Sequence, residues 1–373
     1  MREVLDDLVG WWSAGETVGV GTVVGTWRSA PRPPGAAMLV GPDGTAVGSV
    51  SGGCVEGAVY EEAKDVVAGG EPTLQRYGVS DDDAFAVGLT CGGILDVYVE
   101  AVNRETFPEL GEVAASVAAH EPVAVVTCVK GPADRLGRRM VLWPDRASGS
   151  FGEQHLDGAV ADDARGLLAA GRTATLTYGH DGERRGDDLT LFVSSFAPPA
   201  RMVVFGAIDF AAAVARVGSF LGYRVTVCDA RPVFATARRF PDADEVVVEW
   251  PHRYLQAEAD AGRIDERTVL CVLTHDPKFD VPLLEVALRL PVAYVGAMGS
   301  RRTHDERLDR LREAGLKPDE LDRLSSPIGL DLGARTPEET AISIAAEVIA
   351  GRWGGTGERL TGVDGPIHRT ADR

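Results

Sequence analysis

The chain has 373 residues, enough for two domains that each have a hydrophobic core. Its 45% hydrophobic and 25% charged residues are typical of globular proteins, and its net charge of −18 argues against nucleic acids and anionic membranes as partners. We expect no membrane span and no signal peptide, because the required apolar runs are missing. The five cysteines lack zinc-finger spacing, which predicts reduced thiols in the cytoplasm.

The chain opens with a predicted helix, strand and hairpin. Apolar residues fall on one side of a helix over residues 1–14, and residues 18–27 have the pattern of a strand. A proline-rich loop, RSAPRPPG (28–35), separates this strand from a hairpin over 36–50. Arg32 in the loop is a candidate for contacting an anion. The simpler alternative is a solvent-exposed turn.

A glycine turn follows the hairpin, in the stretch GSVSGGCVEGAVYEEA. Here Ser51, Gly52 and Gly53 lead into Cys54, and an amphipathic helix is predicted over 55–68. Glycines let the backbone approach a ligand closely, and a helix N-terminus offers free N–H groups and a positive dipole end to anions. The same position favours a thiolate, so Cys54 is a candidate nucleophile or metal ligand. The alternative is a tight turn around a small buried cysteine.

A second glycine-flanked cysteine precedes the next strand. The motif GLTCGG places Cys91 before Gly92 and Gly93, and the strand-like segment ILDVYVE follows directly. Two thiols in two glycine turns indicate one site that contains both Cys54 and Cys91.

The first half of the chain contains an internal repeat. Residues 48–78 align with residues 149–179 without a gap. We therefore predict a duplicated strand–hairpin–helix unit over about 15–100 and 120–197. The residues of the first copy that recur in the second are Gly48, Ser49, Gly57, Ala58, Val59, Ala63, Ala68, Gly70, Tyr77 and Gly78.

The second copy lacks the chemistry of the first. In place of Gly-Gly-Cys it has Glu153, Gln154 and His155, and nothing in it matches the CGG motif. Glu56 aligns with Asp157. Folding explains the positions that both copies share, whereas the glycines and thiols of the first copy alone are not needed to make the fold. The comparison favours a functional role for the two cysteines.

The second half of the chain is predicted to be a Rossmann-like domain. After Pro198-Pro199, residues 201–231 read as strand, glycine turn at Gly206, helix, strand and a closing acidic residue, Asp229. The usual glycine fingerprint is degraded, since Ile208 and Asp209 stand where a pyrophosphate would approach. We predict this domain over 200–352, after an N-terminal domain over 1–197 and before a flexible tail over 353–373.

Further strands are predicted over 244–250, 267–276 and 291–300. Ligands of such sheets bind at the carboxyl ends of the strands. Ser300 is predicted to cap a helix over 301–314, whose first turn contains two arginines that serve a bound anion or are simply solvated. The candidate residues at these strand ends are Gly206, Asp229, Arg231, His275, Gly296, Gly299, Ser300 and Arg301.

These motifs together resemble the XdhC/CoxI family, the accessory factors of xanthine and carbon monoxide dehydrogenases. The matching segments include SAPRPPGAAMLV, GSVSGGCVEGAV, GLTCGGILDVYVE, YVGAMGSRR and SPIGLDLGARTPEETAISIAAEVIA, and they cover most of the chain in the family's order. The resemblance implies the fold class α/β, with an N-terminal α+β domain and a C-terminal Rossmann-like parallel sheet. It also implies a cytoplasmic homodimer.

Members of this family are understood to bind the molybdenum cofactor (molybdopterin), to assist its sulfuration and to deliver it to the large subunit of a molybdenum hydroxylase. A cysteine desulfurase-type protein is the implied sulfur donor. By resemblance, Cys54 and Cys91 hold the metal–sulfur end or relay sulfur, and soft thiolates suit such a centre. The remaining candidates for cofactor binding in the first half are Arg32, Ser51, Gly52, Gly53, Glu56, Gly92 and Gly93.

Two hypotheses of different class follow. The first is a carrier of the molybdenum cofactor that is not itself an enzyme. The second is an NAD(P)-dependent oxidoreductase that uses the Rossmann-like domain. The first half keeps its glycines and the second half does not, which favours the carrier and disfavours NAD(P). The chain also departs from the family at Arg28, where a glycine is usual, which puts the conformation of that loop in question.

Overall fold

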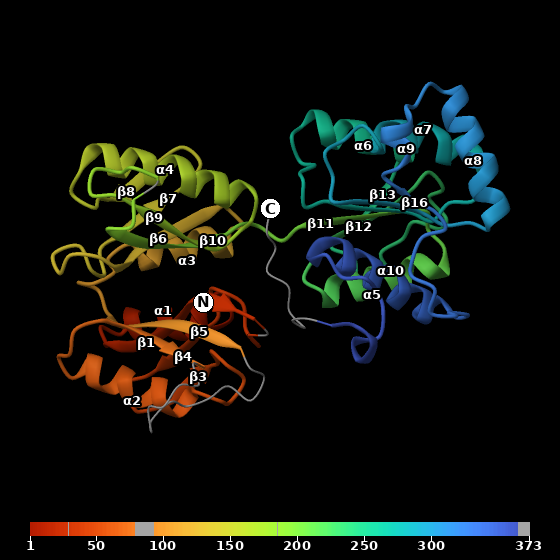
Figure 1. Ribbon diagram of the computed structural model, residues 1–373. Helices are drawn as coiled ribbons and strands as arrows, with labels where there is room; N and C mark the ends of the chain where they lie inside the picture. The colour runs from red at the N-terminus through yellow and green to blue at the C-terminus, as the bar shows by residue number, and fades with distance from the viewer. Residues whose placement is uncertain (29, 79–92, 185, 365–373) are drawn as a thin grey trace. The chain divides into compact units, whose positions relative to one another are not determined.

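A computed structural model describes residues 1–28, 30–78, 93–184 and 186–364 (Figure 1). These residues divide into two compact units, 1–198 and 199–364. Among the described residues, no helix is both long and apolar enough to cross a bilayer.

The first unit contains two five-stranded antiparallel sheets with the same strand order. The first sheet has the order β3-β2-β1-β5-β4 and the second the order β8-β7-β6-β10-β9. The strands of the first sheet are β1 (Val18–Trp27), β2 (Ala37–Val40), β3 (Ala46–Gly48), β4 (Thr73–Tyr77) and β5 (Ile94–Val102). Those of the second are β6 (Val123–Lys130), β7 (Arg139–Leu142), β8 (Ala147–Gly149), β9 (Ala174–Tyr178) and β10 (Leu189–Phe196).

Helices cover both sheets of this unit (Figure 1). Helix α2 (Glu56–Val67) packs on one face of the first sheet, and α4 (Gln154–Ala169) packs on the second sheet in the same way. The opposite faces share a third core with α1 (Leu5–Ser13) and α3 (Leu110–Ala118). A 3-10 turn, η1 (Arg2–Val4), precedes α1.

Equivalent ladder pairs confirm the predicted duplication. Met38 pairs with Gly48 in the first copy, and Met140 pairs with Gly149 in the second. Both glycines have φ of +84°, and a Cβ on either would collide with a carbonyl oxygen of the neighbouring strand. Folding therefore explains why both copies keep a glycine at this position.

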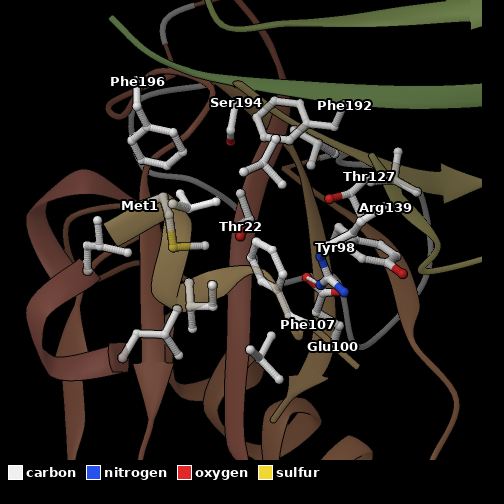
Figure 2. Close-up of a pocket in the computed structure, with 18 residues that line it drawn as sticks. Met1, Thr22, Tyr98, Glu100, Phe107, Thr127, Arg139, Phe192, Ser194 and Phe196 are labelled. Atoms are coloured by element: carbon white, nitrogen blue, oxygen red, sulfur yellow. Dashed lines mark ion pairs between the residues drawn. The ribbon is translucent and has the colours of Figure 1, made fainter. Parts of the chain in front are cut away.

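The interface between the copies encloses a small cavity of about 40 Å³ (Figure 2). Tyr98 and Glu100 reach it from the first copy, and Thr127 and Arg139 reach it from the second. Arg139 forms a buried ion pair with Glu100 and lies over the ring of Phe107. The Tyr98 hydroxyl is buried with no hydrogen-bond partner in the described part of the chain. Sequence analysis did not identify this polar cluster.

The second unit is a six-stranded parallel sheet of order β13-β12-β11-β14-β15-β16. Numbered within the unit, this is the order 3-2-1-4-5-6 of Rossmann folds, which confirms the predicted fold class. The strands are β11 (Arg201–Phe205), β12 (Arg224–Asp229), β13 (Glu245–Val248), β14 (Val269–Val272), β15 (Tyr294–Ala297) and β16 (Leu324–Ser325).

Helices lie on both faces of this sheet (Figure 1). One face carries α5 (Asp209–Phe220) and α10 (Pro337–Trp353). The other carries α6 (Pro251–Asp260), α7 (Pro277–Ala287), α8 (Arg301–Glu313) and α9 (Pro318–Leu321). A 3-10 turn, η2 (Leu360–Gly362), follows α10.

The backbone at Arg28 agrees with the glycine that is usual there. Arg28 has φ of +59°, in the left-handed region, and its side chain is exposed. This conformation costs a non-glycine residue about 1 kcal/mol or more.

We expect Arg28→Gly to raise the free energy of unfolding by about 1 kcal/mol in urea titrations. His120→Gly should also raise the free energy of unfolding, because the φ of His120 is +57°. The control is Glu121→Gly at the neighbouring exposed residue, which should lower the free energy of unfolding.

Candidate functional site

The predicted glycine turn lies between β3 and α2 and holds Cys54 at the edge of the first copy. Gly52 has φ of +77° and Gly53 has φ of +117°, conformations that glycine adopts without strain. No described atom lies within 4 Å of the Cβ position of either glycine, so a ligand has room to approach. Cys54 is half-buried and packs against the core under α2.

The carboxylate of Glu56 organises this turn. It accepts hydrogen bonds from the N–H groups of Ser51 at 2.9 Å, Gly53 at 2.8 Å and Val55 at 3.2 Å, and from two serine hydroxyls. The Ser51 hydroxyl in turn accepts from the N–H of Cys54 at 2.9 Å. Side chains of the turn therefore already occupy the N–H groups of Ser51, Gly53, Cys54 and Val55, so these four groups are not available to an anion.

The second copy uses the same device with one glycine, Gly152, whose φ is +99°, in place of the Gly52-Gly53 pair. Asp157 accepts from the Ser150 hydroxyl at 2.6 Å and from the N–H of Phe151 at 2.8 Å. A carboxylate at this position therefore stabilises the turn in both copies, which gives Glu56 a structural role. Cys54 lies before α2, whereas His155 lies in the first turn of α4, so the two do not both begin a helix. The glycines replace one helical turn by a loop.

Glu56 gives the turn a pH dependence. Burial would raise the pKa of Glu56, but hydrogen bonds from Ser49 and Ser51 outweigh it and lower the pKa from 4.5 to about 2. A depressed carboxyl pKa stabilises the fold above pH 4.5, and this contribution is lost as the pH falls towards 2. Glu56→Gln should therefore cost about 1–2 kcal/mol at pH 7, after allowance for solvent screening, and much less at pH 3.

Urea titrations at both pH values would measure this difference. Glu61→Gln on the exposed side of α2 is the control, because Glu61 forms only a surface pair with Lys64 and its loss should cost under about 0.5 kcal/mol. Equal costs of Glu56→Gln at pH 7 and pH 3 would contradict the assignment.

The other candidates of the first half are dispersed or not described. Cys91 and Gly92 lie outside the described residues, so the prediction that Cys54 and Cys91 share a site stays a prediction. Gly93 is buried directly before β5. Arg32 forms an ion pair with Glu3 at the start of the chain, rather than contacting the Cys54 turn.

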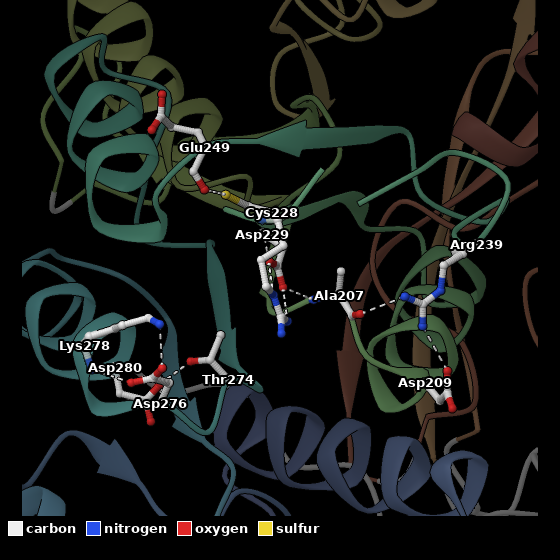
Figure 3. Close-up of polar contacts among 11 residues, drawn as sticks. Ala207, Asp209, Cys228, Asp229, Arg239, Glu249, Thr274, Asp276, Lys278 and Asp280 are labelled. Carbon is white, nitrogen blue, oxygen red and sulfur yellow. Dashed lines mark hydrogen bonds and ion pairs between the residues drawn. The ribbon is translucent and has the colours of Figure 1, made fainter. Parts of the chain in front are cut away.

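Asp229 is committed to contacts within the second unit (Figure 3). It is 2% exposed and accepts from the N–H of Ala207 at 2.7 Å. The Arg231 guanidinium donates to both carboxylate oxygens, at 2.9 and 2.8 Å. Burial would raise the pKa of Asp229, but the bonds from Arg231 and Ala207 outweigh it and lower the pKa. The Asp229 carboxylate therefore ties the glycine turn to β12.

Several strand-end glycines have packing roles. Gly206 has φ of +108°, and a Cβ there would lie 3.0 Å from the N atom of Thr274. Gly296 lies inside β15, where a Cβ would collide with Ile328. Gly299 has φ of +156° and adjoins Thr303 of α8. These contacts give the glycines a role in the sheet and its loops.

The polar residues at the strand ends are mostly exposed. Ser300 caps α8 as predicted, accepting from the N–H of Thr303 at 3.1 Å. Arg301 and His275 are exposed. Asp276 caps α7 and pairs with Lys278 at 2.9 Å.

A buried network under these loops was not predicted. Arg307 donates to Asp280 at 3.0 Å and to the carbonyl oxygen of Met298 at 2.7 Å, and both charged side chains are under 7% exposed. The Thr274 hydroxyl also donates to Asp280 (Figure 3). Leu311, one helical turn after Arg307, is fully buried. This spacing could have revealed the arginine, because residues four apart share a helix face.

The geometry of the second unit disfavours a dinucleotide. Ile208 precedes α5, and Asp209 begins the helix where a pyrophosphate would need positive potential. We expect calorimetric titration with NAD or NADP to show no binding at micromolar concentrations. Micromolar binding of either nucleotide would overturn this expectation.

The remaining described cysteines are core residues. Cys128, Cys228 and Cys271 are fully buried, and burial raises their pKa values to about 11, 12 and 12. Within the described residues, no cluster of three His, Cys, Asp or Glu side chains is arranged to hold a metal ion.

Two family models match the chain. The model described as "XdhC and CoxI family" matches residues 11–78 and 116–179, one stretch in each copy of the repeat. The model described as "XdhC Rossmann domain" matches residues 202–348 in the second unit.

Similar proteins align over most of the chain. A probable xanthine dehydrogenase subunit from Bacillus subtilis is 28% identical over 89% of this chain and 92% of its own. The molybdenum cofactor insertion chaperone PaoD of Escherichia coli is 27% identical over 89% of this chain and 82% of its own. A crystal structure described as a xanthine dehydrogenase from Bacillus halodurans covers 97% of both chains, with 25% identity and a TM-score of 0.68.

Proposed function

Because this chain belongs to the XdhC and CoxI family, we propose that it binds the molybdenum cofactor, assists its sulfuration and inserts it into a xanthine dehydrogenase-type molybdenum hydroxylase. The name of the PaoD relative, an insertion chaperone for this cofactor, supports the proposal. The name of the Bacillus subtilis relative supports xanthine dehydrogenase as the kind of enzyme served.

One observation carries the assignment of the site. The glycine turn with Cys54 interrupts the start of α2 in the first copy, while the second copy builds the same fold without it. Two glycines with positive φ hold the cysteine in a loop instead of a helical turn. The fold does not require this loop, so we attribute it to the ligand.

Each residue of the turn has a distinct part in the proposal. The Cys54 thiolate is a soft donor, suited to a molybdenum–sulfur centre. In a sulfur relay, the same thiolate attacks the terminal sulfur of a desulfurase persulfide, and the donor cysteine leaves as a thiolate. Gly52 and Gly53 leave space for the ligand. Glu56 and Ser51 fix the backbone of the turn and act as positioning residues.

We further propose that the protein works as a cytoplasmic homodimer with three partners. These are the cofactor, a cysteine desulfurase-type sulfur donor and the large subunit of the hydroxylase. Cys91 is proposed as the second thiol of the site.

The test is the molybdenum and molybdopterin content of the protein purified from cells that make the cofactor. We expect bound cofactor in near-stoichiometric amount, and activation of apo-hydroxylase when the loaded protein is added. Protein that carries no molybdopterin and does not activate the enzyme would overturn the proposal.

A further inference from the structure

The first unit has a second polar pocket, of about 220 Å³, where its two copies meet. Arg2 and Glu3 line it from the turn η1 at the start of the chain, and Arg32 lines it from the first copy. Thr173, Ser194 and Ser195 line it from the second copy. Its volume is well above the roughly 30 Å³ that one water occupies in the liquid. The three charged side chains comprise two arginines and one glutamate, in a chain whose net charge is −18. The side chains that line the pocket therefore carry more positive than negative charge, although the protein as a whole is acidic.

Arg32 is incompletely satisfied in this pocket. One of its terminal nitrogens pairs with Glu3, but its Nε is buried and has no hydrogen-bond partner among the described residues. A buried donor without a partner is costly, and an oxyanion at the guanidinium would satisfy it. A guanidinium is also suited to bidentate contact with phosphate.

Glu3 is a weak internal competitor for Arg32. The Glu3 side chain is 71% exposed and that of Arg32 is 31% exposed. Ion pairs with one exposed partner contribute little to stability, so displacement of Glu3 costs little. A phosphate monoester carries more negative charge than a carboxylate and offers three acceptor oxygens.

Other donors surround the same space. Arg2 donates to the carbonyl oxygen of Ala197 at 2.7 Å, which uses one of its five N–H groups. The Thr173 hydroxyl accepts from the N–H of Ser195 at 3.1 Å, so its own hydrogen is directed elsewhere. The lining of one pocket thus includes two arginines and a threonine, all with hydrogen-bond donors.

We infer that this pocket binds the phosphate of a phosphate monoester, with Arg32 as the main contact and Glu3 as the group that it displaces. The inference deepens the proposed function, because the identity of the natural ester, the terminal phosphate of molybdopterin, rests on that function. The inference that the pocket binds a phosphate group depends only on the residues that line the pocket. Retention of the cofactor would then depend on two places in the first unit, the Cys54 turn and this pocket.

The experiment uses full-length protein from cells that lack the cofactor, titrated with phenyl phosphate and with inorganic phosphate by calorimetry. We expect phenyl phosphate to bind, and Arg32→Gln to weaken it about tenfold or more, the loss for a hydrogen bond to a charged group. Glu3→Gln should strengthen binding several-fold, because it removes the competitor. Arg28→Gln is the control in the same loop and should leave binding within about twofold, since Arg28 does not line the pocket. Circular dichroism and melting temperature verify that each variant is folded.

Each outcome separates the alternatives. Equal weakening by Arg32→Gln and Arg28→Gln, or weaker binding in Glu3→Gln, would overturn the inference. Binding of inorganic phosphate with no binding of the ester would also overturn it, because the pocket would then take free phosphate. Ester binding in a protein that never retains molybdopterin would support the pocket and reject the proposed function. If the protein retains molybdopterin in a Cys54-dependent way but binds no phenyl phosphate, the proposed function is supported and the phosphate pocket is rejected.

Discussion

Replacing Cys54 with alanine is expected to abolish retention of the molybdenum cofactor, while His155→Ala leaves retention unchanged. The two residues align in the repeat, but only Cys54 has the glycine loop and a thiol. Cys54 is half-buried, so its loss should change the free energy of unfolding by less than about 1 kcal/mol. The measurement is bound molybdopterin per protomer, with the melting temperature of each variant.

The histidine is a useful control because it aligns with Cys54 in the sequence repeat, although it lies in the first turn of α4 and Cys54 lies in a loop before α2. Cys91→Ala should also abolish retention if the two thiols share a site. Normal retention in Cys54→Ala, or loss in His155→Ala, would reject the assignment of the site to the first copy.

Arg307→Met should destabilise the second unit by about 3–5 kcal/mol. Arg307 and Asp280 form a buried pair, and removing one partner of such a pair leaves an uncompensated charge in the interior. This loss is a large fraction of the total stability of a typical domain. Urea unfolding monitored by circular dichroism measures it directly.

The matched control lies on the same helix. Arg302 pairs with Glu306 at 2.9 Å with an 88% exposed side chain, so Arg302→Met should cost under about 0.5 kcal/mol. The double variant Arg307→Met, Asp280→Asn should recover part of the loss, since no buried charge then remains. Equal costs for the two single arginine variants would contradict a structural role for the buried pair.

The architecture was predictable from the sequence because it follows from local patterns. Runs of apolar residues mark the central strands β1 and β6, which are buried along most of their length, and the recurrence of Gly48 at Gly149 revealed the duplication. Capping residues were predictable in the same way: Ser300 accepts from the N–H of Thr303 at 3.1 Å at the start of α8, as its place before the helix pattern predicted.

The polar interior was not predictable, because a charged residue in isolation indicates a surface. Glu100 lies within the apolar strand β5 and Arg139 begins β7, and only the packing of the two copies brings them together. The role of Glu56 was missed for a related reason. Its carboxylate folds back onto the preceding turn, and the sequence shows the glycines of that turn without the bonds that fill it.

The pair between Glu100 and Arg139 also makes the association of the two copies asymmetric. The strand registers of the two sheets show which residues are equivalent. Thr22 pairs with Ala37 in the first copy and Thr127 pairs with Arg139 in the second, so Arg139 occupies the position of Ala37. By the same register, Ser194 occupies the position of Glu100. If the first copy associated with itself, Glu100 would face an alanine and remain a buried, uncompensated charge. The two halves are therefore complementary rather than interchangeable, and each has become the specific partner of the other within one chain.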